Sequence, residues 1–233
     1  MKKLTSSFLI LMSVLVFQGS VLAQSKETRD ISGFNEVSFG VSGDLFLKIG
    51  SEFRLEIEGD QDVIDDIETI VSGDRLIIRK ENWKFSLNDE RVTINLTMPS
   101  LEGVGVSGSG KVQIMDPVKA SDLNLSVSGG GKLYTQRLEV EDLECSISGS
   151  GNINLGSEGN IEDGKISISG SGNFNGDQTK IGRLSVSISG SGNCRCSVGE
   201  SLEAQVSGSG NVTYSGNPRV NAKVSGSGHV RSS

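Results

Sequence analysis

The chain has 233 residues, with 22 Lys and Arg against 29 Asp and Glu, and a formal net charge of −7. An acidic chain without a clustered Lys/Arg face is a poor candidate for binding nucleic acid or an anionic membrane surface. Aromatic residues make up only 5% of the chain, whereas glycine occurs 31 times. This composition favours a thin structure with close backbone approaches over a thick globular core.

The first 23 residues have the pattern of a cleaved secretory signal. Lys2 and Lys3 form a basic start, Phe8–Phe17 is a short apolar run, and Val21–Ala23 fits a cleavage site. A membrane anchor is the alternative, but spanning a bilayer needs about twenty apolar residues, roughly twice this run. We therefore expect cleavage after Ala23 and export to the periplasm, the outer surface or the medium.

The remaining chain, residues 24–233, is long enough to bury a core as one domain. Without Lys2 and Lys3 it carries 20 basic and 29 acidic residues, a formal charge of −9. It contains no second long apolar run, so we expect no transmembrane segment in the mature chain. Residues 24–100 have an irregular pattern, and residues 101–233 a regular one.

The irregular part is nevertheless rich in strand patterns. Leu45–Ile49, Phe53–Ile57, Leu76–Ile78 and Val92–Leu96 are predicted strands. Val41–Gly43 resembles a degenerate copy of a motif that recurs later in the chain. The irregular part is therefore expected to be built on the same plan as the rest.

Residues 63–71 are expected to form one short helix, because their apolar residues fall at helical spacing: Val63, Ile64, Ile67 and Ile70. Trp83 and Phe85 follow, and we expect them to cover an open end of the structure, since terminal repeats are usually atypical. The densest acids of the chain lie in the same region: Asp60, Asp62, Asp65, Asp66 and Glu68. A solvated acidic face is the simpler interpretation of these acids than a catalytic site.

A Ser-Gly-Ser-Gly motif then recurs through the second part of the chain. Residues 188–194 read Ile-Ser-Gly-Ser-Gly-Asn-Cys, and seven such copies begin at residues 106, 127, 147, 168, 188, 206 and 224. Their spacings are 21, 20, 21, 20, 18 and 18 residues. Repeats of this length cannot bury their apolar face alone, so they must stack on one another.

Apolar and polar residues alternate on both sides of each motif, as in Leu184, Val186 and Ile188 before one copy and Cys194 and Cys196 after it. A period of two marks strands with one buried face. The same phase continues through the motif, so we expect both glycines to point inward at a tight corner. The structural corner residues are Gly108, Gly110, Gly129, Gly131, Gly149, Gly151, Gly170, Gly172, Gly190, Gly192, Gly208, Gly210, Gly226 and Gly228.

These patterns predict an all-β solenoid of two sheets, with rungs of 18–21 residues stacked about 4.8 Å apart. Each rung contains two short strands, one glycine corner and one return turn. Inward Val, Ile and Leu should stack in columns, while outward Ser and Asn form ladders. A flexible Gly/Ser linker is the alternative, but a linker would lack the flanking strands.

The pattern closely resembles a bacterial family known as the putative auto-transporter adhesin, head GIN domain. The resemblance covers residues 29–231 and rests on the opening Arg29–Val37, the Leu45–Ile57 stretch and the Ser-Gly-Ser-Gly series. It implies a right-handed β-helix of two sheets, similar in shape to pectin lyases but without their catalytic residues. It also implies a role in adhesion, mostly in Bacteroidetes-like bacteria.

The sequence contains no recognisable catalytic motif, and we expect neither an enzyme nor a cofactor. His229, the only histidine, replaces Asn at the last corner and is expected to be a surface substitution. Calcium-binding repeats would have a nine-residue period with fixed Asp, which this chain lacks. Cys145, Cys194 and Cys196 match neither a disulfide framework nor a zinc pattern, so we expect small buried hydrophobic residues.

Three functional hypotheses remain. The first is an exported, non-catalytic structural or binding protein, an adhesin-like module of the cell surface or periplasm that binds a glycan, envelope or protein partner. The second is a polysaccharide lyase or hydrolase on a solenoid scaffold, with an acid such as Asp66 as a catalytic residue. The third is an architectural, self-assembling envelope subunit, a homo-oligomer that stacks end to end or forms a trimer.

Overall fold

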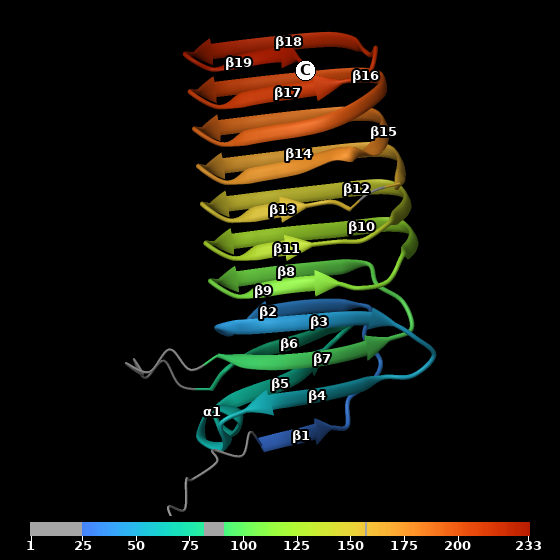
Figure 1. Ribbon diagram of the computed structural model, residues 1–233, viewed down its shortest axis with the longest axis vertical. Coiled ribbons are helices and arrows are strands. Elements are labelled where there is room, and N and C mark those ends of the chain that lie inside the picture. The colour runs from blue at the N-terminus through green and yellow to red at the C-terminus, as the bar shows by residue number, and fades with distance from the viewer. Residues whose placement is uncertain (1–24, 82–90, 157) are drawn as a thin grey trace, which may run out of the picture.

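The computed structural model describes residues 25–81, 91–156 and 158–233. These residues form a two-sheet β-solenoid whose rungs stack along one axis, with β18 and β19 at one end (Figure 1). The predicted fold class is therefore confirmed. The predicted signal segment, Trp83 and Phe85 lie outside the described residues. None of the helices in the described ranges is long and apolar enough to cross a membrane.

We name the two sheets after the side chains that project from them. The asparagine sheet contains, in spatial order, β1 (Ser25–Arg29), β4 (Arg54–Gly59), β7 (Val92–Met98), β3 (Gly43–Ile49), β9 (Lys111–Ile114), β11 (Lys132–Tyr134), β13 (Asn152–Asn154), the first part of β15 (Asn173–Gly190), the first part of β16 (Asn193–Gly208), β17 (Asn211–Ser215) and β19 (His229–Ser232).

The serine sheet forms the other face of the solenoid. It contains, in spatial order, β5 (Ile67–Ser72), β6 (Arg75–Lys80), β2 (Glu36–Gly40), β8 (Gly103–Gly108), β10 (Val118–Gly129), β12 (Leu138–Gly149), β14 (Asn160–Gly170), the second parts of β15 and β16, and β18 (Arg219–Gly226). Because β15 and β16 continue through the return turn, each contributes to both sheets.

Successive corners stack in register, so the repeat length in the sequence is the length of one rung. Gly190 lies beside Gly170 on one side and Gly208 on the other. Two backbone hydrogen bonds tie this corner to the one before it, from the Ser191 N–H to the Gly170 carbonyl over 2.8 Å and from the Asn193 N–H to the Gly172 carbonyl over 3.1 Å. The ladder of strands thus continues through the bend.

The two glycines of a corner have different roles, and the prediction that both point inward is wrong for the first. Gly190 has φ +123°, a conformation that L side chains rarely adopt, and a Cβ there would overlap the Gly170 carbonyl of the neighbouring rung. Gly192 is buried and does point inward, where a Cβ would lie 2.5 Å from Cγ2 of Ile168. The alternation of inward and outward side chains is interrupted at the first glycine of each corner, because the chain turns there.

The core consists of apolar columns between the two sheets. One column on the serine sheet contains Val106, Val127, Ile147, Ile168, Ile188 and Val206, all at most 2% exposed. The three cysteines belong to such columns and are buried and free, which confirms the prediction of small buried residues. The solenoid is therefore held together by side chains that contact the same type of residue one rung away.

The N-terminal part has the same plan but a different order. β2 and β3 form one rung, with a corner at Val41 and Ser42, and Oγ of Ser42 lies 3.4 Å from Oγ of Ser109 in the first regular corner. The predicted degenerate corner is thus confirmed. This rung lies between β6 and β7 on one side and β8 and β9 on the other. An early segment of the chain is therefore inserted between later ones.

The helix predicted over residues 63–71 is only partly correct. Helix α1 spans Gln61–Asp65, and the next residues form β5, which pairs antiparallel with β6. Ile67–Val71 reads Ile-Glu-Thr-Ile-Val, and three of its five residues are β-branched apolar residues that favour strands. As a strand, this segment pairs with the edge of β6 that β2 leaves open. β1, α1 and β5 together cover the N-terminal end of the solenoid (Figure 1).

Candidate binding surface

A row of amide side chains runs along the outside of the asparagine sheet, directly after the corners. It consists of Asn152, Asn173, Asn193 and Asn211, which occupy equivalent positions in successive rungs. After the first Asn, each Nδ2 donates to the Oδ1 of the preceding one, over 2.9, 2.9 and 3.0 Å. We call this row the amide ladder. Each Nδ2 has a second hydrogen that the ladder does not use, so the row can donate to a ligand.

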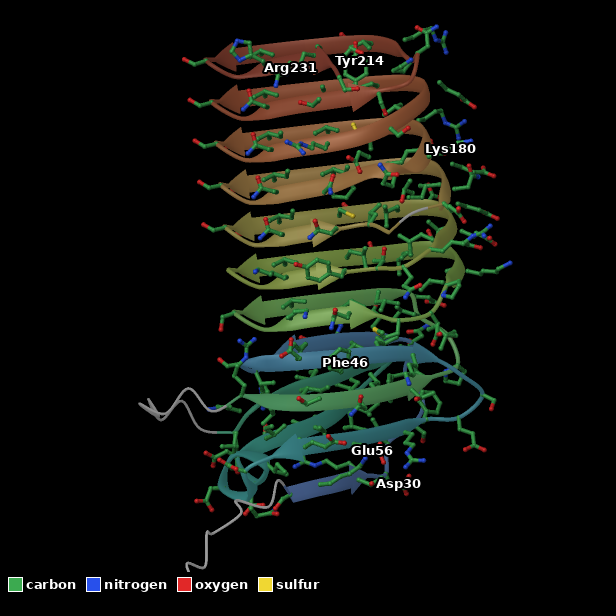
Figure 2. All side chains as sticks on the ribbon, viewed as in Figure 1. Asp30, Phe46, Glu56, Lys180, Tyr214 and Arg231 are labelled. Atoms are coloured by element: carbon green, nitrogen blue, oxygen red, sulfur yellow. The ribbon has the colours of Figure 1, made fainter. Side chains whose placement is uncertain are left out.

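A second row lies two residues further along each strand. Tyr134, Asn154, Asn175, Arg195, Thr213 and Arg231 occupy equivalent positions in successive rungs. Arg195 and Arg231 are two rungs apart, which corresponds to about 9.6 Å at the normal strand spacing. Figure 2 shows Arg231 near the end of the stack, among the polar side chains of the last rungs. Two guanidinium groups are therefore placed on one face at a regular interval.

The two rows enclose a hollow of about 550 Å³ over β15, β16, β17 and β19. Oδ1 of Asn175 is buried and has no hydrogen-bond partner in the described part of the chain. A buried acceptor of this kind is usually satisfied by a water or a ligand. The lining residues are Asn173, Phe174, Asn175, Asn193, Cys194, Arg195, Asn211, Thr213, His229 and Arg231. We call this region the hollow.

The hollow is basic although the chain as a whole is acidic. Its described lining contains Arg195, Arg231 and His229 but no Asp or Glu. Asp177 lines a smaller adjoining hollow beyond Arg195. A guanidinium group presents a planar fork of N–H donors that matches a carboxylate or another oxyanion. The lining therefore favours an anionic ligand that also carries hydroxyl or carbonyl groups.

Sequence reasoning missed this site, although a signal was present. Arg195 and Arg231 both lie three residues after the second glycine of their corners, and Thr213 holds the same place in the rung between them. Equal offsets from a repeated corner indicate one outward row. His229, expected to be a surface substitution, is exposed and lines the hollow as the next residue after Asn211 in its row.

The acids that the sequence singled out lie far from the hollow, at the opposite end of the solenoid. Asp60, Asp62, Asp65 and Asp66 are exposed on and beside α1, and Nε2 of Gln61 donates to Asp65 over 2.8 Å. Glu68 pairs with Arg79 over 2.9 Å. Among the described residues, no group of three or more His, Cys, Asp or Glu is arranged to hold a metal ion.

A further column of acids lies on the serine sheet near the return turns. Asp122, Asp142 and Asp163 are followed in the same column by Arg183. Nε of Arg183 donates to Asp163 over 2.6 Å, and this contact holds the pKa of the Asp163 carboxyl below its usual range. A lowered pKa makes Asp163 a weaker base. The pair therefore offsets the charge of Asp163 between two neighbouring rungs.

The three free cysteines are buried, which makes their thiols poor nucleophiles. Burial raises the pKa of the Cys145 thiol, and a hydrogen bond with Cys196 together with burial raises that of Cys194. The thiolate is the reactive form of cysteine, so a raised pKa suppresses nucleophilic attack. Cys194 contacts the hollow from below but is itself fully buried.

The corner glycines line up along one edge and leave the broad faces to other residues. Their backbone groups take part in bonding between rungs: the Gly108 carbonyl accepts from the Gly130 N–H over 2.8 Å, and the Gly228 N–H donates to the Gly208 carbonyl over 3.1 Å. Their role is to let rungs approach closely. Ligand contacts must come from the sheet faces, the return turns or the ends.

Several solved structures share this fold. A protein described as a "putative adhesin" from Bacteroides fragilis is 23% identical, covers 90% of this chain and 97% of its own, and has a TM-score of 0.85. A "putative adhesin" from Parabacteroides distasonis is 22% identical with a TM-score of 0.74, over 90% of this chain and 97% of its own. A "putative lipid binding protein" from the same species is 22% identical with a TM-score of 0.70, over 90% of this chain and 96% of its own. At these identities the likeness shows the fold alone.

No protein of curated function matches the sequence. The family model described as "Putative auto-transporter adhesin, head GIN domain" matches residues 33–218, which is most of the chain and includes six of the seven corners. The resemblance seen in the sequence is therefore confirmed, and the chain belongs to this adhesin-head family.

Proposed function

We propose that the protein is an exported, non-catalytic adhesin-like module that binds an anionic polysaccharide across the hollow of its asparagine sheet. The observation that carries this proposal is the pair Arg195 and Arg231, set among amide side chains in a hollow whose described lining has no carboxylate. Membership of the adhesin-head family supports a binding role. The basic and apolar start of the chain supports export.

An anionic sugar chain fits the chemistry of the hollow at three points. Guanidinium groups form paired, charge-assisted hydrogen bonds to carboxylates or sulfates. The second Nδ2 hydrogens of the amide ladder can donate to sugar hydroxyls and ring oxygens. Oδ1 of Asn175 supplies an acceptor for a hydroxyl. Because the rows repeat with every rung, a polymer laid along the solenoid axis meets similar groups at regular intervals.

Titration calorimetry of residues 24–233 with polygalacturonate, and with neutral dextran as the comparison, tests the proposal. We expect binding to polygalacturonate that weakens as salt rises, and none to dextran. Arg195→Ala should weaken binding about tenfold or more, since one charge-assisted pair is lost. Lys180→Ala, on an exposed return turn, is the matched control and should bind as the unchanged chain does.

Two results would contradict the proposal. The first is equal affinity of the Arg195→Ala and Lys180→Ala variants, because the hollow would then not be the site. The second is release of unsaturated or reducing-end products from polygalacturonate, which would favour the lyase or hydrolase hypothesis. Asp66→Asn then decides whether the exposed acid near α1 takes part in that chemistry.

Export is tested separately by fractionating cells that produce the full chain. We expect the protein in the periplasm, on the surface or in the medium, shortened at its N-terminus to begin near residue 24. Retention in the cytoplasm at full length would contradict this part of the proposal.

A further inference from the structure

Both ends of the solenoid leave strand edges without a partner in the described chain. At the C-terminal end β18 pairs only with β16, and β19 only with β17. At the N-terminal end β5 pairs only with β6, and β1 only with β4. Free edges of this kind are ready to pair with another strand.

Four of the five large hydrophobic side chains that are exposed in the described chain lie at the same two ends, and the fifth, Met115, follows β9 within the stack. Val220 and Val224 on β18 are 42% and 40% exposed, whereas their equivalents one rung below, Leu202 and Val206, are 1% and 2% exposed. These positions belong to the core columns, but no further rung covers them. At the other end, Ile70 and Val71 on β5 are 38% and 37% exposed. At each end, therefore, apolar side chains are exposed to solvent beside an unpaired strand edge.

The two ends carry opposite charge. Residues 60–74, which include α1 and β5, contain five Asp and one Glu but no Lys or Arg. β1 at the same end adds Lys26 and Arg29, which form ion pairs with Glu56, Glu58 and Glu27, so the end remains acidic. Residues 204–233, which form the last rungs, contain no Asp or Glu but include Arg219, Lys223, His229 and Arg231. Two C-terminal ends brought together would repel each other, and so would two N-terminal ends. A C-terminal end and an N-terminal end attract.

From these observations we propose that copies of this chain associate head to tail, with the C-terminal end of one copy seated on the N-terminal end of the next. In this arrangement β18 extends onto β5 of the next copy, and β19 onto its β1, so both sheets and the apolar core continue across the junction. Arg219 and Lys223 then face the acids of α1 and β5. A head-to-tail contact forms a ring only where its rotation brings the last copy back to the first. Copies stacked along the solenoid axis move steadily away from the first copy, so the product is an open filament.

This proposal does not depend on the binding role of the hollow, and its test uses residues outside the hollow. Sedimentation velocity of residues 24–233 over a range of concentrations should show mass rising beyond a dimer in low salt and falling in high salt. A C-end variant carries Arg219→Glu and Lys223→Glu, which makes both ends acidic. An N-end variant carries Asp62→Lys, Asp65→Lys, Asp66→Lys and Asp74→Lys, which changes the formal charge of residues 60–74 from −6 to +2 and makes both ends basic.

We expect each variant alone to associate at least about tenfold more weakly than the unchanged chain, because like charges then meet at the junction. An equimolar mixture of the two variants should recover assembly, since acidic ends again meet basic ends. Lys180→Glu changes the same kind of charge on a return turn, away from both ends, and should assemble normally. Circular dichroism establishes that every variant is folded.

Four outcomes would overturn the proposal. The first is an unchanged chain that stays monomeric at every concentration, and the second is a dimer that does not grow. The third is a folded variant pair that fails to assemble when mixed. The fourth is a loss of assembly in Lys180→Glu as large as in the end variants. The first shows that no junction forms. The second shows a closed, symmetric contact, and the last two show that charge acts elsewhere than at the ends.

Discussion

The amide of Asn193 donates to Oδ1 of Asn173 over 2.9 Å and accepts from the amide of Asn211 over 3.0 Å. Asn193 is thus bonded to both neighbouring rungs through its side chain, in addition to the backbone ladder. Because the two middle amides, Asn173 and Asn193, both donate and accept, the row fixes their orientation and that of the hydrogens that they leave free. The stability of the stack and the shape of the binding surface are therefore linked.

Replacing Asn193 with Ala removes two of these side-chain hydrogen bonds. We expect the free energy of unfolding to fall by about 1 kcal/mol, because one bond is exposed, the other is only part-buried, and both compete with water. Urea unfolding measures the change. Ser189→Ala, an outward position on the serine sheet in the same rung, is the control and should change stability little. Equal stability of the two variants would show that the amide ladder contributes nothing.

The corner glycines should tolerate substitution poorly, whereas Gly130, which replaces the middle Ser of its motif, should tolerate it well. Gly190→Ala and Gly192→Ala should each destabilise the fold by about 1–3 kcal/mol, the first through positive φ and overlap with Gly170, the second through overlap with Ile168. Gly130 has open space around its Cβ direction, so Gly130→Ala should be neutral or slightly stabilising. Thermal unfolding of the three variants decides. A loss at Gly130 as large as at Gly190 would contradict the assignment.

The three thiols should not react with iodoacetamide in the folded protein. All are buried, and the pKa values of Cys145 and Cys194 are raised, so little thiolate is present at neutral pH. Mass spectrometry should find no adduct in native buffer and adducts at all three cysteines in denaturant. Rapid labelling of native Cys194 would show that the hollow opens into the core.

Loss of Arg183 should raise the pKa of Asp163. Arg183 now lowers that pKa, chiefly through its hydrogen bond, so the folded state holds this proton less tightly than the unfolded state does. The resulting stability is present above the unfolded pKa, about 3.9, and is lost as pH falls through the lower folded pKa. In Arg183→Met, NMR titration should show the Asp163 carboxyl moving back toward its usual pKa. An unchanged titration would mean that the pair does not persist in solution.

The charge of the hollow can be changed with almost no change of shape. Asn175→Asp places a carboxylate beside Arg195 in the next rung, so anionic polysaccharide should bind more weakly, by about tenfold. Calorimetry with polygalacturonate measures the change, and Asn154→Asp, one rung outside the described lining, is the matched control. Affinity that is unaltered by Asn175→Asp would argue against an anionic ligand in the hollow.

The regular rungs could be predicted because the information is local. A glycine corner every 18–21 residues specifies where each rung turns, and identical corners stack only in one register. The prediction that Gly190 points inward was wrong. Alternation of inward and outward residues assumes an extended chain, whereas the backbone turns at Gly190 with a positive φ.

The N-terminal order was beyond the sequence because it depends on choices between similar partners. β2 pairs with both β6 and β8, and nothing in Glu36–Gly40 distinguishes these neighbours from the next strand in the chain. The apolar spacing of Val63–Val71 fits a helix and a strand alike. In the structure the helix ends at Asp65, and the residues from Ile67 onward pair with β6 as a strand. The hollow was also missed, because Arg195 and Arg231 are far apart in the sequence and share one face only after the rungs are stacked.

The insertion of the β2–β3 rung between later rungs also determines how the molecule responds to force. In a stacked array each rung is held by its neighbours alone, so β18 and β19 can peel away first and the rungs below can follow one at a time. The β2–β3 rung pairs on both sides with strands that come after it in the chain. It can therefore detach only after the strands on both sides have separated from it. Under a steady pull from its two ends, the protein should therefore lengthen in small steps from the C-terminal side and keep a stiff N-terminal block until the last step.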